Sequence, residues 1–502
     1  MPRDGWIGWA VPGIIAVLGG ILRFLNLGRP HKLVFDETYY VKDGWSLIQY
    51  GVEVSSRLEA KKADELFTAG NADIYGTTGS YVVHPPVGKW LIGIGEWIFG
   101  IESSFGWRFA VALLGTMSIL IVGRVARRLF RSTWLGGVAA FLLAFEGLHL
   151  TMSRTGILDI IVMFFALAGF AALLVDRDRS REILAQRVGA LPPGEYPRWG
   201  PWLGWRPWRW VAGLSLGLCV STKWSGIFFI AVFGLMTVLW DLGARRAAGV
   251  DNWFGTAFLT DGPFAAVQLV VLSAVIYPVS WAGWFLSDRG YLRNWAQDNP
   301  ELGVSWLPPA LRSWAHYHHE MWRFSTTLTT EHSYMSNPWG WMVQARPTSF
   351  FYEGPTLGDN GCHVDQCSQA VTTIGTLPLW WGGTLALIVV LYQWIVRRDW
   401  RAGAALSGIA AGYLPWFNWQ HRTIFTFYEV AFEPWVVLAV TMCIGLFLRS
   451  ARDAPTRRLY VWAVAGFLLL ELALFAWNYP IHTAEVIPYT QWYLRMWFPS
   501  WI

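Results

Sequence analysis

The chain has 502 residues, of which 54% are apolar and only 15% are charged, and it contains 35 tryptophans. This composition excludes an ordinary soluble domain and predicts an all-α polytopic membrane protein. The formal net charge of +5 does not indicate a nucleic-acid partner, because Lys and Arg in a membrane protein serve mainly to orient its helices.

Apolar runs long enough for membrane helices recur along the whole chain. The first run, residues 6–28, is too long for the apolar part of a signal peptide and has no small-residue cleavage site after it, so we expect a retained span. A span needs roughly 20 mostly apolar residues. About eleven transmembrane helices are predicted, centred near residues 17, 118, 143, 166, 214, 233, 273, 385, 409, 439 and 468.

Basic residues between the runs predict the orientation. A cytoplasmic N-terminus puts every dense basic cluster on the cytoplasmic side, namely residues 124–131, 176–182, 244–246, 397–401 and 449–458. An odd number of spans then places the C-terminus outside the cell. We therefore expect residues 1–502 to form one transmembrane domain in the cell membrane.

Two large loops would lie on the external side, residues 27–104 and residues 286–373. Within the first loop, the apolar stretch 87–100 is too short for a span, and a span there would invert every later loop. We predict an interfacial or re-entrant helix for it. Loops that carry dense polar and aromatic residues are where function concentrates, so the external face is the candidate site.

The adjacent acids Asp36 and Glu37 follow the first span in the stretch "KLVFDETYYVKDGW". One interpretation is a solvated helix start, where acids favour the helix dipole. The aromatic neighbours Phe35, Tyr39 and Tyr40 favour another interpretation, because they would partly desolvate a carboxylate and raise its basicity. A carboxylate with a raised pKa suits a general base.

Further candidates lie near the predicted external boundary, where polar residues are costly and often functional. His84 and Lys89 occur in "YVVHPPVGKW", although Lys89 could equally be a lysine that snorkels to the interface. Arg154 and Asp159 flank the start of one span, and an interhelical salt bridge is a competing explanation for both. Lys223 lies at a turn between two spans.

The second large loop and the turn near residue 422 add more candidates. The histidines near residue 318 lack the spacing of a metal motif, so no metal site is predicted. Candidate substrate contacts are His84, Asp159, Glu320, His332, Tyr334, Trp339 and Tyr428. Cations converge from several loops, as a phosphate at membrane level would require: Lys89, Arg154, Lys223, Arg346 and Arg422.

The four cysteines divide into two kinds. Cys219 and Cys443 lie in apolar runs and are expected to be small buried side chains. Cys362 and Cys367 are close together in a polar loop, and a disulfide between them is expected if that loop faces an oxidising compartment.

Acids, scattered cations and an apolar bundle suggest transfer of a sugar from a lipid phosphate to a hydroxyl. The phosphate is a good leaving group that cations can stabilise, whereas the hydroxyl needs a base. One carboxylate suffices for a single displacement with inversion. No cofactor is required by this chemistry, and dependence on a divalent metal stays open.

Six ordered motifs resemble the protein O-mannosyltransferases: "FDETYY", "HPPVGKW", "SRTGILD", "STKW", "EMWRFSTTLTTEHSYMSNPWGW" and "RTIFTFYE". The resemblance covers nearly the whole chain and is strongest to the actinobacterial branch. It implies a GT-C membrane fold with eleven spans, polyprenyl-phosphate mannose as donor, and a Ser or Thr acceptor on an unfolded secretory polypeptide near the Sec translocon. It also implies that Asp36 and Glu37 carry catalysis, although the match leaves their individual roles open. We assign Asp36 as the base and Glu37 as a supporting group that orients the acceptor or the sugar.

Eukaryotic members of that family carry a MIR carbohydrate-binding domain in the long external loop, and residues 286–373 are too few to contain one. Two alternatives stay open: a GT-C lipid-phosphate sugar transferase with a lipid or glycan acceptor, and a lipid or sugar transporter whose acidic pair couples an ion.

Overall fold

The computed structural model describes residues 4–192, 195 and 198–502, and it is mostly helical. Within this part of the chain, seven helical segments are long and apolar enough to cross a membrane. They are α1 (Ile7–Phe24), α5 (Ser104–Phe130), α8 (Asp159–Gly189), α10 (Gly226–Ala247), Trp253–Ser280, α17 (Leu377–Ile395) and α20 (Ala454–His482).

All eleven predicted helix centres lie in helical segments of these residues. Four of them fall in shorter helices, α6 (Thr133–Ala144), α9 (Pro207–Val220), α18 (Trp400–Gly412) and α19 (Glu433–Arg449). The segment Trp253–Ser280 is irregular, because it contains two π-helical stretches, η1 and η2. Its parts are α11 (Trp253–Thr256), η1 (Ala257–Asp261), α12 (Gly262–Ala266), η2 (Val267–Val271) and α13 (Leu272–Ser280).

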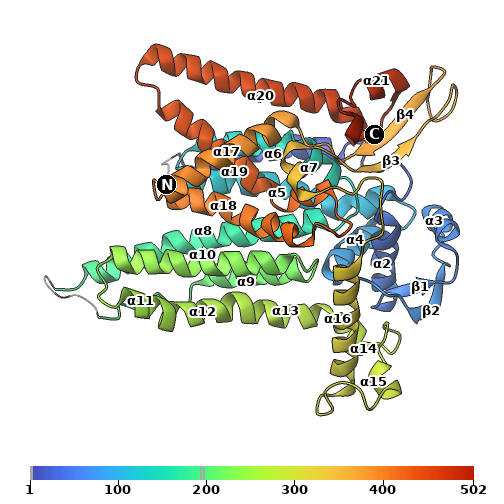
Figure 1. Ribbon diagram of the computed structural model, residues 1–502, viewed down its shortest axis with the longest axis horizontal. Helices are drawn as coiled ribbons and strands as arrows, with labels where there is room; N and C mark the ends of the chain where they lie inside the picture. Colours follow the sequence, from blue (N-terminus) through green and yellow to red (C-terminus); the bar gives the residue numbers. More distant parts are fainter. Residues whose placement is uncertain (1–3, 193–194, 196–197) are drawn as a thin grey trace.

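The two ends of the long helices differ in how much structure their connections contain. The C-terminal end of α8 and the α10–α11 connection lie on the left in Figure 1, at the end where the N-terminus is marked. The other end, which we call the loop-rich end, holds the short helices, the strands and the C-terminus. Its helices are α2 (Glu37–Tyr50), α3 (Ala60–Thr68), α4 (Val87–Phe99), α7 (Gly147–Met152), α14 (Ala282–Leu286), α15 (Trp295–Asp298), α16 (Pro309–Thr327) and α21 (Tyr489–Tyr493).

Five short strands at the loop-rich end depart from the all-α expectation. They form two antiparallel sheets, one of β1 (Val54–Ser56) and β2 (Tyr75–Gly79), the other of β3 (Ser349–Glu353), β4 (Cys367–Thr372) and β5 (Val486–Pro488) in the order β3-β4-β5. Strands of three to six residues are too short to show a clear alternating pattern in the sequence. The remaining elements are the 3₁₀ turns η3 (Pro338–Val343), η4 (Leu414–Trp419), η5 (Thr426–Ala431) and η6 (Pro499–Trp501).

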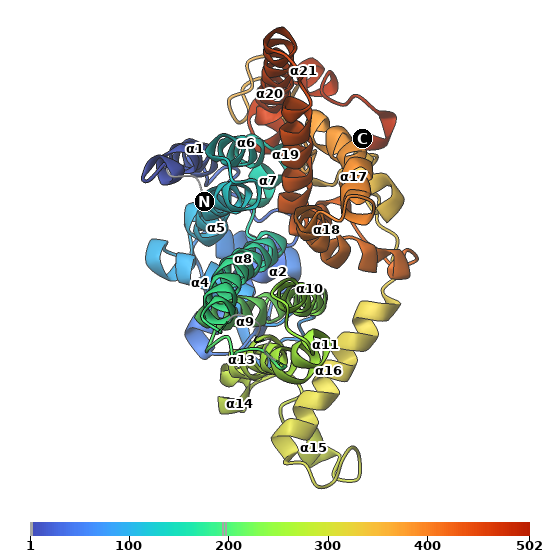
Figure 2. The same cartoon turned by 90° about the vertical axis from the view of Figure 1, so that its left-hand side faces the viewer.

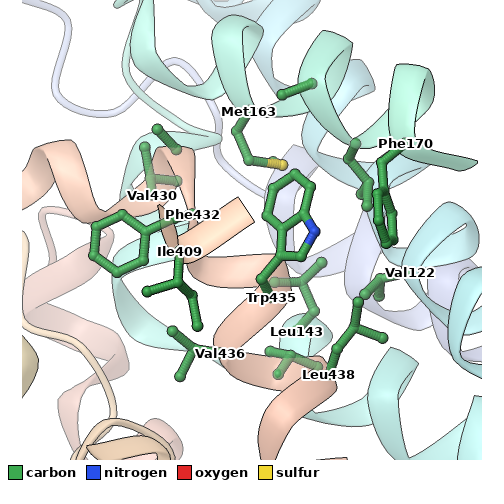
Figure 3. Close-up of a cluster of buried hydrophobic side chains, with 14 of the residues drawn as sticks. Val122, Leu143, Met163, Phe170, Ile409, Val430, Phe432, Trp435, Val436 and Leu438 are labelled. Carbon is green, nitrogen blue, oxygen red and sulfur yellow. The ribbon is translucent and has the colours of Figure 1, made fainter. Parts of the chain in front are cut away.

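Trp435 lies at the centre of the main core and is fully buried. Figure 3 shows its indole among side chains such as Met163, Phe170 and Ile409, which come from α8 and α18. A Cβ on Gly408 would lie 1.9 Å from the Trp435 ring, so α18 can approach α19 this closely only with glycine at that position. The core thereby fixes α8, α18 and α19, which lead into the candidate site.

Helices α2 and α4 pack against each other at the loop-rich end. A Cβ on Gly93 of α4 would lie 2.4 Å from the carbonyl oxygen of Gly44 in α2, so the close approach again requires glycine. The stretch 87–100 is a 13-residue helix, α4, and not one of the long apolar helices.

Helix α16 runs across the long helices rather than along them (Figures 1 and 2).

Candidate active site

Asp36 immediately precedes α2, but its carboxylate does not cap that helix. Among the residues that the structure describes, the only hydrogen bond to this carboxylate comes from the Tyr40 hydroxyl, at 3.5 Å. Burial raises the pKa of Asp36 to about 6, with Lys223 opposing the shift and Asp159 adding to it. The side chain is therefore available as a base rather than used to start a helix.

Phe35 fixes the direction in which Asp36 faces. Its backbone has φ +49°, a left-handed conformation that costs a non-glycine residue roughly 1–2 kcal/mol. Ring packing holds it there, since Phe35 stacks on Phe350 with centroids 4.7 Å apart and meets Phe427 edge-on at 5.5 Å. His332 also lies edge-on to Phe35, with centroids 6.2 Å apart.

Glu37 is fully buried and both of its oxygens accept from protein groups. Oε1 accepts from Arg108 Nε at 2.8 Å and from the Gly156 amide at 2.7 Å. Oε2 accepts from Arg108 Nη2 at 2.8 Å and from the Val34 amide at 3.0 Å. These contacts leave Glu37 holding the loop that carries Asp36.

Arg108 pins the same loop a second time, because its guanidinium also donates to the carbonyls of Leu27, Pro30 and Lys32. The sequence interpretation did not single out Arg108. The feature that could have revealed it is its position as a charged residue in the first turns of an apolar span, where a charge is costly without a partner.

Lys223, Asp159 and Tyr428 form a cluster beside Asp36. Lys223 Nζ lies 2.9 Å and 3.1 Å from the two Asp159 oxygens and 4.4 Å from the centre of the Tyr428 ring. Burial alone would lower the pKa of Lys223, but attraction to Asp159 and Tyr428 outweighs it, so the pKa is raised and the amine stays protonated. The cluster joins α8, the α9–α10 turn and η5.

Arg422 has fewer protein partners than the other candidate cations near Asp36. Within the described part of the chain, its guanidinium donates no hydrogen bond and forms no ion pair, and its Nε is buried without a partner. Arg422 nevertheless acts electrostatically on Tyr428 and His84, which places it near both. An unpartnered buried donor is costly, so this guanidinium is suited to an anionic ligand.

His84 lies next to Tyr40, with ring centroids 6.0 Å apart. Burial and the nearby cations Lys223, Lys89 and Arg422 hold its pKa well below the usual value, so the imidazole is neutral. A neutral imidazole can donate a hydrogen bond to a substrate or accept one from it.

Two of the predicted phosphate ligands are occupied by the protein itself. Lys89 is buried and pairs with Glu53, which is also buried. Arg154 donates to the carbonyls of Leu22, Arg23, Leu25 and Asn26, where α1 ends. Both side chains therefore support the site's framework in this structure.

Arg346 is tied to two other segments. Its guanidinium donates to the Ser333 carbonyl at 2.5 Å and 3.0 Å, lies 5.2 Å from the Tyr334 ring centre, and also bonds the Ser500 carbonyl. Beside it, the backbone carbonyl of Gln344 accepts from Trp501 Nε1 at 2.8 Å. The loop 332–346 is thus held by residues 500–501.

The other expected contacts are more dispersed. Trp339 is 73% exposed and touches Phe417 edge-on, and Glu320 on α16 lies 3.9 Å from Arg323. Cys362, in the β3–β4 connection, forms a disulfide with Cys367, the first residue of β4. The described residues include no group of three or more His, Cys, Asp or Glu side chains that could hold a metal ion.

A cavity of about 910 Å³ adjoins the loop that leads to Asp36. Its walls are polar, and two ion pairs connect them, Arg29 with Glu485 at 3.1 Å and Lys32 with Glu353. Asn26 and Gly28–Lys32, from the loop between α1 and α2, line this cavity. Arg108 bonds the Pro30 carbonyl in the same segment, so the loop that carries Asp36 also forms a wall of the cavity.

Two family models match the chain. Residues 13–277 match dolichyl-phosphate-mannose-protein mannosyltransferase, and residues 310–501 match the C-terminal four-transmembrane region of protein O-mannosyltransferase. The polyprenol-phosphate-mannose–protein mannosyltransferase of Mycolicibacterium smegmatis is 38% identical over 519 residues, covering all of this chain and 94% of that protein. The one from Mycobacterium tuberculosis is 36% identical over 516 residues, covering all of this chain and 93% of that protein.

A solved structure shares the fold. One chain of the Saccharomyces cerevisiae protein O-mannosyltransferase Pmt1-Pmt2 complex superimposes with a TM-score of 0.72 at 15% identity, over all of this chain and 93% of that chain. This confirms a multi-pass membrane protein with a GT-C-like fold. With both family models and full-length relatives above 30% identity in agreement, the chain belongs to the protein O-mannosyltransferase family.

Proposed function

We propose that this protein transfers mannose from polyprenyl-phosphate mannose to Ser and Thr hydroxyls of secreted or membrane proteins, with inversion of the anomeric centre. Its relatives carry the name of that activity. One observation carries the proposal: the Asp36 carboxylate, with a raised pKa, lies within electrostatic reach of Lys223, and the unpaired Arg422 lies near the same cluster.

In this reaction the Asp36 carboxylate takes the proton of the acceptor hydroxyl while the hydroxyl oxygen attacks the anomeric carbon. The bond between that carbon and the phosphate oxygen breaks, and the phosphate leaves with the electron pair. Lys223 and Arg422 stabilise the charge that grows on the leaving oxygen, and no general acid is needed. The products are the acceptor with mannose on its Ser or Thr oxygen and polyprenyl phosphate, and Asp36 is left protonated and neutral.

The remaining site residues take supporting roles. Glu37 is a positioning residue, because Arg108 and two backbone amides occupy its oxygens, and this replaces the substrate-orienting role expected from the sequence. His84, Asp159, His332, Tyr334 and Tyr428 are proposed to contact substrate, whereas Lys89 and Arg154 are proposed to act through the framework. The cations in the site make a divalent metal unnecessary for this chemistry.

The loop-rich end is proposed to face outward from the cell membrane. The N- and C-termini lie at opposite ends of the long helices, and the basic ends of α8 and α10 lie opposite the site (Figure 1). Such an orientation would present Asp36 to unfolded Ser/Thr-rich polypeptides as they leave the translocon.

The test is transfer of labelled mannose from polyprenyl-phosphate mannose to a Ser/Thr-rich peptide by membranes that contain the protein. Asp36→Asn should lower the rate by about 10²–10⁴-fold while the protein still folds. Asp73→Asn, at an exposed acid between α3 and β2, is the matched control and should keep full activity. Full turnover by Asp36→Asn would remove Asp36 as the base, and transfer only to lipid or glycan would favour that acceptor class.

A further inference from the structure

A directed chain of hydrogen bonds connects α16 to the turn that carries Lys223. His318 Nδ1 lies 2.8 Å from the Trp314 carbonyl, Tyr277 Oη lies 2.8 Å from His318 Nε2, and Trp224 Nε1 lies 2.7 Å from Tyr277 Oη. Trp224 immediately follows Lys223 in the sequence.

The two ends of the chain fix the direction of every hydrogen bond in it. A carbonyl can only accept, so His318 Nδ1 carries the hydrogen and Nε2 is free to accept. An indole N–H can only donate, so Trp224 donates to the Tyr277 oxygen and Tyr277 donates to His318 Nε2. Burial lowers the pKa of His318 to about 4, which keeps the ring neutral and Nε2 available near neutral pH.

Aromatic packing encloses this chain. The His318 ring lies 4.1 Å from Trp314, 5.1 Å from Trp281 and 5.9 Å from Trp224, measured between ring centroids. Trp281 follows α13, so the enclosure joins the end of one long helical segment to α16. Because α16 runs across the long helices (Figures 1 and 2), the chain connects this crossing helix to the α9–α10 turn.

Lys223 needs such support, because its ammonium must stay at one place between two partners. Its Nζ is held by Asp159 on one side and faces the Tyr428 ring on the other. Its backbone is held within its own turn, where its amide bonds the Cys219 carbonyl at 3.2 Å and its carbonyl accepts from Gly226 at 2.9 Å. The Trp224 indole ties the turn to Tyr277 of α13 and, through Tyr277, to His318 of α16. The turn has a second tie at Ser221, whose carbonyl accepts from the Val87 amide of α4 at 3.1 Å, but this contact does not involve Lys223 or its immediate neighbour.

We infer that the Trp224–Tyr277–His318 chain is a positioning device for Lys223, through which α16 holds the phosphate-binding end of the site. This inference rests on the proposed function, because it takes Lys223 as a ligand of the donor phosphate. His318, Tyr277 and Trp224 act through Lys223 and are not themselves placed against the reacting atoms.

The test compares His318→Ala and Tyr277→Phe with the neighbouring His319→Ala. His319 is exposed and its ring contact is with His316 at 6.5 Å, so this variant is the matched control. Losing one link of the chain should raise the KM for polyprenyl-phosphate mannose roughly tenfold, as expected for one hydrogen bond. The KM for the acceptor peptide should not change, and His318→Gln, which keeps an acceptor at similar reach, should restore most of the donor KM.

A second readout separates this inference from the proposed function. Binding of polyprenyl phosphate to purified protein, measured by native mass spectrometry, should weaken in His318→Ala and Tyr277→Phe and stay unchanged in His319→Ala. If the wild type transfers no mannose but this binding pattern holds, the proposed function fails and the positioning role stands. An unchanged donor KM and unchanged phosphate binding in folded His318→Ala and Tyr277→Phe would overturn the inference, as would equal losses for donor and acceptor.

Discussion

Substitution of Glu37 should lower the stability of the fold, whereas substitution of the adjacent Asp36 should lower the transfer rate and leave the fold intact. Glu37→Gln replaces one carboxylate oxygen by an NH₂ group that faces N–H donors from Arg108 and a backbone amide. Breaking a buried ion pair on one side costs roughly 3–5 kcal/mol, out of a typical total of about 5–15 kcal/mol. The unfolded fraction should therefore rise by roughly a hundredfold to a few thousandfold.

The assay is the fraction of monodisperse protein in detergent after a graded heat challenge, together with the transfer rate per folded molecule. Glu37→Gln should lose folded protein, whereas Asp36→Asn should stay folded and lose transfer, because among the described residues the Asp36 side chain has only the long hydrogen bond from Tyr40. Glu59→Gln, at an exposed acid that immediately precedes α3, is the control for the substitution itself. A Glu37→Gln protein as stable as wild type but without transfer would refute the reasoning and make Glu37 a catalytic residue.

Four further outcomes are expected. Because a base acts in its ionised form and the pKa of Asp36 is raised to about 6, transfer rates should be full above that pH and fall as pH drops through 6; a flat profile from pH 5 to 8 would contradict this assignment. Arg422→Ala should lower turnover by roughly 10²–10³-fold through loss of phosphate stabilisation, with the exposed Arg57→Ala as control; wild-type kinetics would remove Arg422 from the site. Transfer should persist in excess chelator, since Lys223 and Arg422 supply the positive charge, and loss that Mg²⁺ or Mn²⁺ restores would show a metal requirement. Replacing Glu353 and Glu485 together by Gln should raise the KM of long unfolded acceptors a few-fold, without affecting short peptides, if acceptor chains extend over the adjoining cavity; equal effects on both lengths would exclude that path.

The eleven predicted helices could be found from the sequence because each leaves an apolar run, and the short strands could not because they leave almost no pattern. At the candidate site, the sequence pointed to Asp36, Lys223 and Arg422 because charged residues near the membrane boundary are costly and often functional. Such charges can be recognised without knowing which residues contact one another. The same reasoning could not show which of the candidate cations have partners within the protein. Lys89, Arg154 and Lys223 look alike in the sequence, and the structure gives each of them a protein partner: Glu53 for Lys89, the end of α1 for Arg154 and Asp159 for Lys223. Lys223 differs because it also acts electrostatically on Asp36.

Arg108 and His318 illustrate the second limit of the sequence. Their partners lie 71 and 41 residues away in the chain, so no local spacing connects them to Glu37 or Tyr277. The loop histidines 316, 318 and 319 looked like one cluster in the sequence. In the structure, His318 turns toward Tyr277 while His316 stacks on Trp295, with ring centroids 3.9 Å apart.

The contact between Trp501 and Gln344 also constrains how the protein is assembled. Residues 500–501 are synthesised more than 150 residues after the loop 332–346 that they hold, and α17, α18, α19 and α20 must enter the membrane in between. The loop that places His332 against Phe35 therefore lacks part of its support throughout that interval. A freshly inserted chain therefore completes this part of its site only after residues 500–501 have been made and have reached the loop.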